Sequence, residues 1–459
     1  MRVLGFVVLV LAAAGGAVLP VGQSQAAAPT SLVLSADPAY AGNDATLAIR
    51  VVSQGDPVPA APVTLERRLD GAWTAIGTVT TDTEGRATQP VLVRKEPGNN
   101  LVRATYAGDA THDPETTRYR LPIRKRNGKV TIDAPREFVD ERSARIGVRW
   151  TTGEGEPVAR GVVRLEKRIT RGEWKLVAKL RTNAEGRAAT RVSPREDSHW
   201  RARSVGLPWV ERDTSRTHFL DNLPPGVPVS LPAAAPSPRR HLKPQAHARG
   251  RGPNPQITRI PTKVWNHMTG ITWHRGCPVG RAGLRLLRIN YWDYQGYRRR
   301  GELVAAASVV GQMSRALAAM YREKLPLRSM YRVDHFGWSS RVRGGDDYAS
   351  MNAGNTSAFN CRDVVGRPGV RSPHSYGRSL DVNTWENPYR SAQGLVPNTW
   401  WQSHSHPRVA WRSRSHAVVR IMTNHGLRWT YGLGDTQHFD AVPPGGRLIR
   451  VPGCTQHCD

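Results

Sequence analysis

Hydrophobic and polar residues alternate over short runs in the first half of the chain. Val63 and Leu65 are separated by one polar residue, and Val102, Ala104 and Tyr106 follow the same pattern. Clusters of Gly, Asp and Pro separate these runs. A period of two is typical of strands that bury one face, and frequent turn residues favour short antiparallel strands. We therefore expect residues 28–222 to be all-β.

An internal repeat divides this region into two copies. The matching pairs are Val63–Glu66 with Val163–Glu166, Trp73 with Trp174, Thr81 with Thr182, and Glu84–Ala87 with Glu185–Ala188. The period of about one hundred residues is far longer than that of a solenoid repeat. It predicts two β-sandwiches, at 27–125 and 126–222, and both copies resemble bacterial immunoglobulin-like modules. Because no acid, His or Cys cluster recurs in both, we expect a spacer or adhesive stalk rather than specific ligand recognition.

The pattern changes after the second copy. Residues 223–259 are rich in Pro, Ala, Arg and Gly, and such a composition predicts a basic, partly extended linker. A globular domain is expected from there on, at 260–459. Its first helix is predicted to open at Gly301, because the following apolar positions are mostly spaced by threes and fours: Leu303, Val310, Met313, Leu317 and Met320.

Further elements are expected along this domain. Residues 330–336 and 357–362 are predicted to be strands, and 416–425 a helix that ends at Gly426. A strand carrying His438 should follow Trp429 and Tyr431. Helices followed by a short antiparallel sheet indicate an α+β domain. The predicted architecture is thus multidomain, with two all-β sandwiches before an α+β domain that contains a small antiparallel sheet.

The N-terminus predicts export. A basic Arg2 precedes the apolar run Val3–Leu11, and small residues follow at Ser24–Ala26. This pattern is typical of a signal peptide, here 1–26, cut after Ala26 because Pro29 disfavours a later cut. The run is shorter than the ~20 residues of a spanning helix, so a membrane anchor is the less favoured alternative. We expect a secreted, cell-wall-associated protein with no membrane span after cleavage.

The formal net charge of +29 predicts an anionic partner. The chain has no helix-turn-helix, zinc-finger or RNA-binding sheet motif, so a specific nucleic-acid partner is not expected. Anionic cell-wall polymers, bound through the basic linker and the modules, agree better with export. The alternative is that the charge reflects only a solvated, Arg-rich surface.

Four cysteines suggest disulfides in an exported protein. Four allow three different pairings. Cys454 and Cys458 are close in sequence, and Cys277 and Cys361 remain. We therefore predict the bridges Cys277–Cys361 and Cys454–Cys458.

The candidate chemistry lies near the C-terminus. His374, Asp381 and His438 offer two imidazoles and one carboxylate, a set that suits Zn²⁺ with a fourth position open to water. Asp435, three residues before the last His, could take a proton from that water. These residue types predict a zinc hydrolase site.

The spacing of these residues resembles a known family. Ser372-x-His374-x-x-Gly377-x-Ser379-x-Asp381, followed by Asp435-x-x-His438, is similar to the M15 peptidoglycan peptidases, which include D-alanyl-D-alanine carboxypeptidases and L-alanyl-D-glutamate endopeptidases. Segments 355–362 and 381–389 resemble the secreted actinobacterial branch of this family. The resemblance covers roughly residues 260–459.

The resemblance implies the roles of individual residues. His374, Asp381 and His438 would hold one Zn²⁺ cofactor, and Asp435 would be the general base in cleavage of peptidoglycan stem peptides. Arg362 would hold a substrate carboxylate or an oxyanion. Arg332 is the alternative for that role.

The chain departs from the family pattern at two positions. Ser379 stands where the family usually has Ala, a small change that should not disturb the metal. Asp435 stands where many carboxypeptidases have Glu, so the bond that is cut stays open between carboxypeptidase and endopeptidase.

Other residues compete for these roles. The remaining candidates are His335, Asp346, Asp347, His404, His406 and His457, which are expected to be structural, turn-forming or exposed. The alternative function is a non-catalytic wall-binding or adhesive protein with a structural metal, which the modules favour and Asp435 opposes. A zinc nuclease is a third reading, but the sequence lacks the phosphate-binding or two-metal clusters that it needs.

Overall fold

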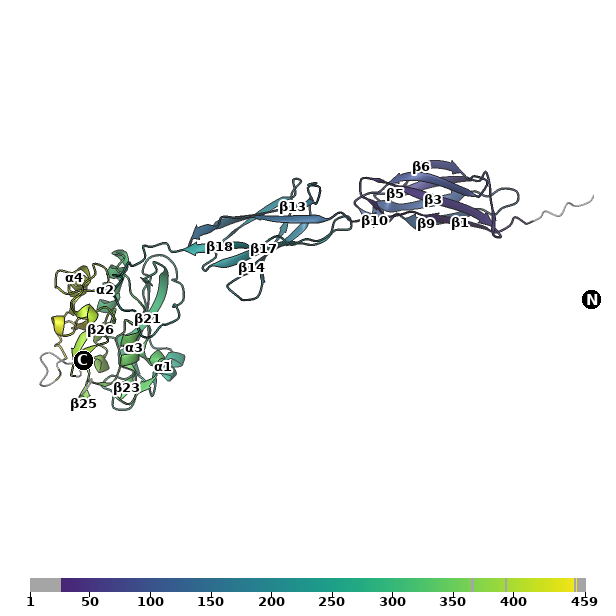
Figure 1. The fold of residues 1–459 in the computed structure, drawn as a ribbon. Helices are drawn as coiled ribbons and strands as arrows, with labels where there is room; N and C mark the ends of the chain where they lie inside the picture. Colours follow the sequence, from purple (N-terminus) through teal and green to yellow (C-terminus); the bar gives the residue numbers. More distant parts are fainter. Residues whose placement is uncertain (1–25, 365–366, 393, 450, 452–459) are drawn as a thin grey trace, which may run out of the picture.

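The computed structural model describes residues 26–364, 367–392, 394–449 and 451. Two β-sandwiches lie end to end, and a domain of helices and small sheets follows the second (Figure 1). Almost all of the predicted signal peptide, together with Cys454, His457 and Cys458, lies outside the described residues. No helix in the described part of the chain is long and apolar enough to cross a membrane.

The first sandwich is built from two antiparallel sheets. One sheet joins β1 (Thr30–Ser35), β4 (Asp56–Pro57) and β7 (Arg86–Leu92) to the central β3 (Asp44–Ser53), and the other has the order β6 (Ala72–Thr80), β5 (Pro62–Leu69), β8 (Leu101–Tyr106), β9 (Glu115–Arg120). Buried and exposed side chains alternate strictly along most of β3. Val63, Leu65, Val102, Ala104 and Tyr106 all lie in the buried core, as the period of two predicts.

The second sandwich repeats this plan. One sheet has the order β11 (Gly128–Asp133), β13 (Ala144–Thr152), β16 (Arg187–Val192), and the other β12 (Glu137–Val139), β18 (His218–Leu223), β17 (Ser198–Ser204), β14 (Val162–Arg168), β15 (Lys175–Arg181). The short β2 (Ala39–Tyr40) and β10 (Ile123–Arg124) pair in parallel at the end of the first sandwich.

Thr81 and Thr182 show that the sequence repeat is also a repeat of contacts. The Thr81 hydroxyl donates to Val58 O at 2.7 Å and accepts from Ala61 N at 2.9 Å. The Thr182 hydroxyl donates to Val158 O at 2.6 Å and accepts from Gly161 N at 2.9 Å. In each copy, therefore, the corresponding buried threonine hydroxyl holds the corresponding loop, 58–61 in the first sandwich and 158–161 in the second.

The C-terminal domain is organised around one helix-covered sheet and one small sheet. The first sheet has the order β19 (Gln256–Thr258), β20 (Leu284–Trp292), β21 (Arg298–Ala306), and the small sheet β26 (Ser379–Asp381), β30 (His438–Ala441), β29 (Leu427–Arg428). Helices α2 (Val310–Arg322) and α4 (Ala417–Asn424) join both sheets in one core. Two short helices, α1 (Thr262–Met268) and α3 (Asp347–Asn352), complete the helices of this domain. Three hairpins are formed by β22 (Trp338–Ser339) with β23 (Gly344–Gly345), β24 (Asp363–Val364) with β25 (Arg367–Arg371), and β27 (Tyr389–Ser391) with β28 (Gly394–Val396). The 3₁₀ turns are η2 (Arg281–Gly283), η3 (Val333–Phe336), η4 (Pro373–Tyr376), η5 (Trp400–Gln402) and η6 (Gly432–Gly434), besides η1 (Pro97–Asn100) in the first sandwich.

The predicted helix from Gly301 is wrong over its first nine residues. Residues 298–306 form β21, which pairs along its whole length with β20, and the helix begins at Val310. Gly301 lies where β21 packs closely against Met330, because a Cβ there would lie 2.7 Å from the Cβ of Met330. The glycine serves close packing in the sheet rather than a helix start.

Two predicted strands also differ, whereas the second helix is confirmed. Residues 333–336 form the 3₁₀ turn η3. Segment 357–362 is extended, but its backbone bonds to several different partners: Ser357 to Asp381, Phe359 to Val304 and Cys361 to Thr272. Such scattered pairing gives no regular ladder. Helix α4 and its caps occupy the predicted range 416–425.

The segment predicted to be a linker lies along the C-terminal domain. The side chain of Gln245 is buried and bonds both the N–H and the C=O of Met330 at 2.8 Å, and it accepts from the Tyr291 hydroxyl at 2.8 Å. Trp385 Nε1 donates to Pro236 O at 2.7 Å. Strand β19, at the end of the segment, extends the β20–β21 sheet. We call residues 224–259 the strap, because they contact the domain along most of their length instead of only connecting it.

Candidate metal centre

The turn that carries His374 is fixed by its neighbours. Ser372 caps η4 by accepting a hydrogen bond from the His374 N–H at 3.3 Å. Gly377 ends the turn with φ +65°, and a Cβ there would lie 2.8 Å from Ala306 N. Glycine is thus required for both the left-handed conformation and the close approach to β21. The chain then enters β26, which ends at Asp381.

Strand pairing brings the second and third candidate ligands together. Strands β26 and β30 are antiparallel, and Asp381 lies directly opposite His438. Ser379 lies opposite Asp440 in the same register. Because side chains alternate along a strand, these two cross-strand pairs share one face of the sheet.

The three candidate ligands converge in the structure. His374 Nε2 lies 3.2 Å from Asp381 Oδ2, His438 Nδ1 lies 3.2 Å from Asp381 Oδ1, and the two ring nitrogens are 3.2 Å apart. The exposed fractions of these residues are between 0% and 2%. Three donor atoms so close together are the arrangement that a single cation would bind.

The outer nitrogens of both imidazoles are held by acceptors. His374 Nδ1 lies 2.7 Å from Ala358 O, which can only accept, so this nitrogen carries the proton and Nε2 is left as a lone pair. His438 Nε2 lies 2.9 Å from Asp440 Oδ1, which leaves Nδ1 as its lone pair. Both lone pairs therefore belong to the nitrogens that converge with Asp381. Two neutral imidazoles and a carboxylate fit Zn²⁺ in charge, in donor type and in number.

Asp440 is a buried carboxylate that the sequence analysis did not single out. It accepts hydrogen bonds from Ser379 Oγ at 2.7 Å and from Thr430 Oγ1 at 2.7 Å, besides the one from His438. Burial alone would raise the pKa of Asp440, but its interaction with His438 and the hydrogen bonds from Thr430 and Ser379 outweigh burial and lower the pKa. The sequence feature that could have pointed to Asp440 is its position two residues after the candidate ligand His438 on the same strand.

Asp435 lies three residues before the candidate ligand His438 in the sequence, and it is 2% exposed. It follows η6, and its backbone forms a bridge with Tyr389 ahead of β30. A buried carboxylate three residues from a ligand is compatible with the predicted proton acceptor.

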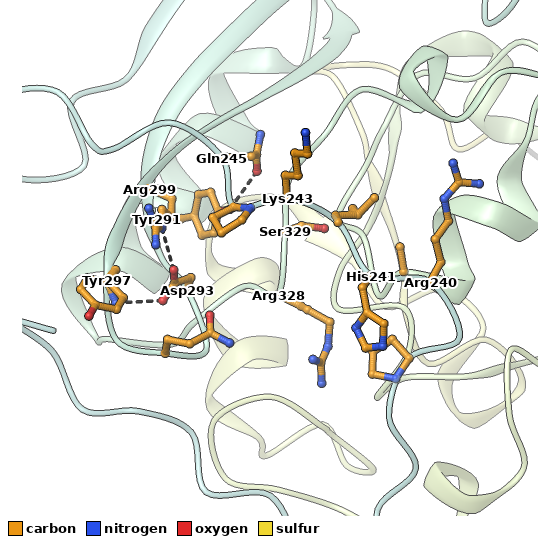
Figure 2. A pocket seen from close by; sticks show the side chains of 15 residues that line it. Arg240, His241, Lys243, Gln245, Tyr291, Asp293, Tyr297, Arg299, Arg328 and Ser329 are labelled. Carbon is orange, nitrogen blue, oxygen red and sulfur yellow. Dashed lines mark hydrogen bonds and ion pairs between the residues drawn. The ribbon is translucent and has the colours of Figure 1, made fainter. Parts of the chain in front are cut away.

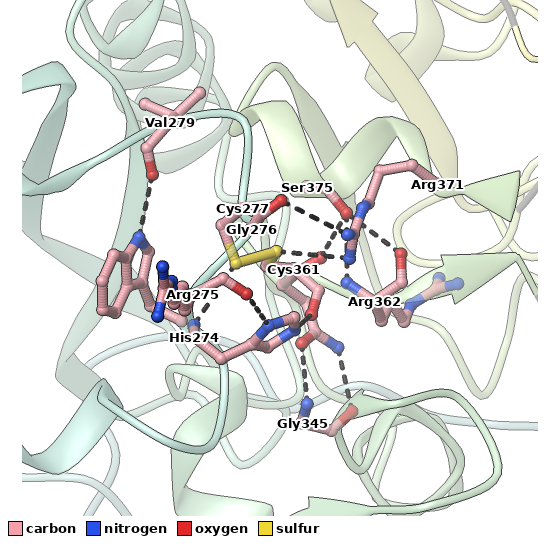
Figure 3. The surroundings of a disulfide bond; sticks show 12 residues. His274, Arg275, Gly276, Cys277, Val279, Gly345, Cys361, Arg362, Arg371 and Ser375 are labelled. Carbon is pink, nitrogen blue, oxygen red and sulfur yellow. Dashed lines mark hydrogen bonds between the residues drawn. A yellow bond between two sulfur atoms is a disulfide. The ribbon is translucent and has the colours of Figure 1, made fainter. Parts of the chain in front are cut away.

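Arg362 is fully buried, with an exposed fraction of 0%. Its guanidinium forms an ion pair with Asp347 at 3.0 Å. Figure 3 shows its backbone N–H donating to the Ser375 hydroxyl, at 3.1 Å. Ser375 is the neighbour of His374, so Arg362 is tied to the turn that carries the first ligand. Asp347, expected to be a turn residue, is instead the ion-pair partner of this arginine.

Arg332, the alternative to Arg362, is engaged in a different network. Its guanidinium pairs with Glu302 and, at 2.8 Å, with Asp334, which also contacts His267. No residue of this network belongs to the group of three converging ligands.

The other candidates lie apart from the three ligands. His404 stacks on Trp400 with ring centroids 3.7 Å apart, and His406 Nε2 contacts Ser230 O of the strap at 3.2 Å. His335 Nε2 lies 3.9 Å from Glu302. Asp346 caps α3 by accepting from Ala349 N at 2.9 Å. These contacts agree with structural roles.

The disulfide Cys277–Cys361 is present (Figure 3), as predicted. It joins the loop after α1 to the residue before Arg362. His274 lies near both cysteines, and the three form the other potential ligand group among the described residues. Because both sulfurs are already bonded to each other, they offer no thiolate to a metal.

A separate cavity of about 250 Å³ lies between the strap and the β20–β21 sheet (Figure 2). Arg240 and Lys243 of the strap line it together with Arg299 and Arg328. Arg299 pairs with Asp293 at 2.8 Å, and Arg328 pairs with the buried Glu386. The cavity contains none of the three candidate ligands, so the metal centre and this basic cavity are different places on the domain.

Comparison with known proteins supports a peptidase domain at this place. Residues 365–441 match the family model described as D-alanyl-D-alanine carboxypeptidase, one of the M15 peptidase models. The matched range contains all three candidate ligands and Asp435. A search of curated proteins gave no match.

Several solved structures share limited similarity with the chain. A tetra-tandem repeat in the extending region of a large adhesion protein is 13% identical, with 61% of this chain and 74% of that chain covered and a TM-score of 0.30. Invasin, a bacterial integrin-binding protein, is 13% identical, with 59% and 47% covered and a TM-score of 0.26.

Proposed function

We propose that this protein is a secreted zinc metallopeptidase that hydrolyses peptide bonds in peptidoglycan stem peptides. The observation that carries the proposal is the convergence of two imidazole lone pairs and one carboxylate from His374, His438 and Asp381, inside the range that matches an M15 family model. When bound, Zn²⁺ supplies a Lewis acid for the scissile carbonyl and lowers the pKa of a coordinated water to about 7.

Asp435 is proposed as the proton acceptor for the attacking water and as the donor to the leaving amine. Its burial and its position ahead of β30 support this role. A carboxylate in such a place would be idle around a purely structural metal, since that metal has no water to activate.

Arg362 is proposed to stabilise negative charge on the substrate, as the family resemblance implies. In the structure its guanidinium is buried against Asp347, so a direct contact with substrate would require a rearrangement of this pair. Its contact with Ser375 supports a second role, in which it holds the His374 turn. Replacing Ser375 with Ala would test that second role without removing the charge.

The alternative, a non-catalytic wall-binding or adhesive protein with a structural metal, is favoured by the two sandwiches. They make up residues 27–222 and include no group of three potential ligands among the described residues. Incubation with purified sacculi, with and without a chelator, separates the two functions. An enzyme releases muropeptide fragments of altered mass and stops when zinc is removed, whereas an adhesive protein releases none.

A further inference from the structure

Asp440 contacts the candidate ligand His438 on the ring nitrogen that points away from the other two candidate ligands. Oδ1 accepts from His438 Nε2 at 2.9 Å and from Ser379 Oγ at 2.7 Å, and Oδ2 accepts from Thr430 Oγ1 at 2.7 Å. Asp440 is 3% exposed and Ser379 is 0% exposed. Both oxygens of the carboxylate therefore have fixed donors in a place that water hardly reaches.

The pairing of the small sheet creates this arrangement. Ser379 lies opposite Asp440, two residues along the strands from the opposed pair of candidate ligands, Asp381 and His438. Thr430 follows β29, which pairs with β30 on its other edge and places Arg428 opposite Asp440. One sheet thus presents two ligands and also the group that holds one of them.

The two histidines are held by acceptors of different charge. His374 donates to the neutral carbonyl of Ala358, whereas His438 donates to a carboxylate. A carboxylate behind an imidazole fixes its tautomer and makes its other nitrogen a stronger electron-pair donor. It can do so only while it keeps its orientation, and the hydroxyls of Ser379 and Thr430 prevent it from turning away.

We propose that Asp440, held by Ser379 and Thr430, is a positioning residue that sets the zinc affinity of the centre through His438. This inference rests on the proposed function, because it concerns the zinc that the three ligands would bind. It assigns a role to three side chains outside the ligand set and makes Ser379 part of the centre's support.

The test measures the zinc dissociation constant of the full-length protein by competition with a chelator of known affinity. Asp440→Asn keeps the shape and removes the charge, and it should weaken zinc binding by about 10–100-fold, the usual effect of losing such a partner. Ser379→Ala and Thr430→Val should weaken it less, in the same direction. Thr430→Ser keeps the hydroxyl and should restore affinity close to that of the wild type.

Ser329→Ala is the matched control. Ser329 is also buried, and its hydroxyl donates to Asn355 at 3.0 Å instead of to a candidate ligand or to Asp440, so its loss should leave zinc affinity unchanged. Unfolding of the metal-free proteins is measured in parallel. If Asp440→Asn destabilises the metal-free protein as much as the zinc-loaded one, the role is merely structural and the proposal is overturned.

The outcomes also separate this inference from the proposed function. If the wild type binds one zinc and Asp440→Asn binds it equally tightly, the inference fails and the proposed function stands. If the wild type binds no zinc, the proposed function itself fails. If Thr430→Ser and Thr430→Val weaken zinc binding equally, the support by the hydroxyl is refuted.

Discussion

At the scale of single residues, the ligands and the general base should respond differently to substitution. His374→Ala, Asp381→Ala or His438→Ala should each lose zinc and activity, because each removes one of three converging donors. Asp435→Ala should keep zinc and lose about 10²–10⁴-fold in rate, the usual contribution of a general base. Metal analysis and rate measurements on the same preparations check this. A fully active Asp435→Ala protein, or one without zinc, would contradict the assignment.

The sequence was sufficient to single out these three candidate ligands, which converge in the structure, but not the side chains that contact them. His374, Asp381 and His438 are marked by residue type and spacing, which are visible in one dimension. The partners Asp440 for His438 and Asp347 for Arg362 depend on strand register and on the placement of α3, which one sequence does not display. From the sequence, Ser379 was expected only to leave the metal undisturbed. Its hydroxyl donates to Asp440, which lies opposite to it on β30, and this contact depends on a strand register that the sequence does not display.

At the scale of elements, periodicity predicted the sandwiches well and the C-terminal domain less well. Strict alternation along β3 follows from one buried face. In the C-terminal domain, β21 is largely buried on both faces, so its apolar residues could also be fitted to the helix that begins nine residues after Gly301. A strand buried on both faces carries no alternation that would separate it from a helix.

Gln245 should show that the strap is part of the folded domain. Gln245→Ala would remove the partner of the Met330 N–H and of the Tyr291 hydroxyl in a buried place, whereas the Met330 C=O would keep its hydrogen bond from the Glu302 N–H. Each unsatisfied buried group costs about 1–3 kcal/mol, so we expect a loss of roughly 2–5 kcal/mol in unfolding free energy. Denaturant unfolding measures it, with the exposed Gln295→Ala as the control. Equal stability of the two variants would mean that the strap is only a tether.

The disulfide should matter for stability more than for chemistry. Cys277 and Cys361 are 84 residues apart, and closing a loop of this length is worth about 4–5 kcal/mol in the chain-entropy model. The double substitution Cys277→Ser/Cys361→Ser should lower the unfolding free energy by up to this amount, with zinc still bound at low temperature. Non-reducing peptide mapping also tests the predicted Cys454–Cys458 bridge, and finding either of these cysteines joined to Cys277 would refute the pairing.

At the scale of the whole molecule, polar contacts connect the second sandwich to the C-terminal domain. Glu141 of the sandwich pairs with Arg298 of the C-terminal domain at 2.5 Å, and Arg195 of the same sandwich holds Glu141 at 3.0 Å. The Tyr297 hydroxyl donates to Asn222 O, and the strap begins directly after this contact. The second sandwich is therefore joined to the C-terminal domain through side chains as well as through the chain.

Removing residues 27–222 should weaken attachment to the wall more than it changes the chemistry. The cut is placed before the strap, because removing residues up to 259 would also delete β19 and Gln245 from the domain. Cleavage of a soluble muropeptide should persist, whereas binding to sacculi should fall. Binding by the full-length protein should also fall as salt rises, since screening shortens charge attraction to ~8 Å near physiological ionic strength. Sacculus binding that is the same with and without the modules, at every salt concentration, would refute their anchoring role.

The central claim is that the three converging ligands make a zinc peptidase for stem peptides. The most direct measurement is mass analysis of defined muropeptides after incubation with the zinc-loaded protein, the chelator-stripped protein and the stripped protein with zinc restored. The account predicts a stem peptide shortened by hydrolysis of one peptide bond, lost on stripping and regained with zinc. The mass difference also decides between a carboxypeptidase and an endopeptidase. Unchanged muropeptides with fully loaded protein, or hydrolysis that is indifferent to zinc, would contradict the account.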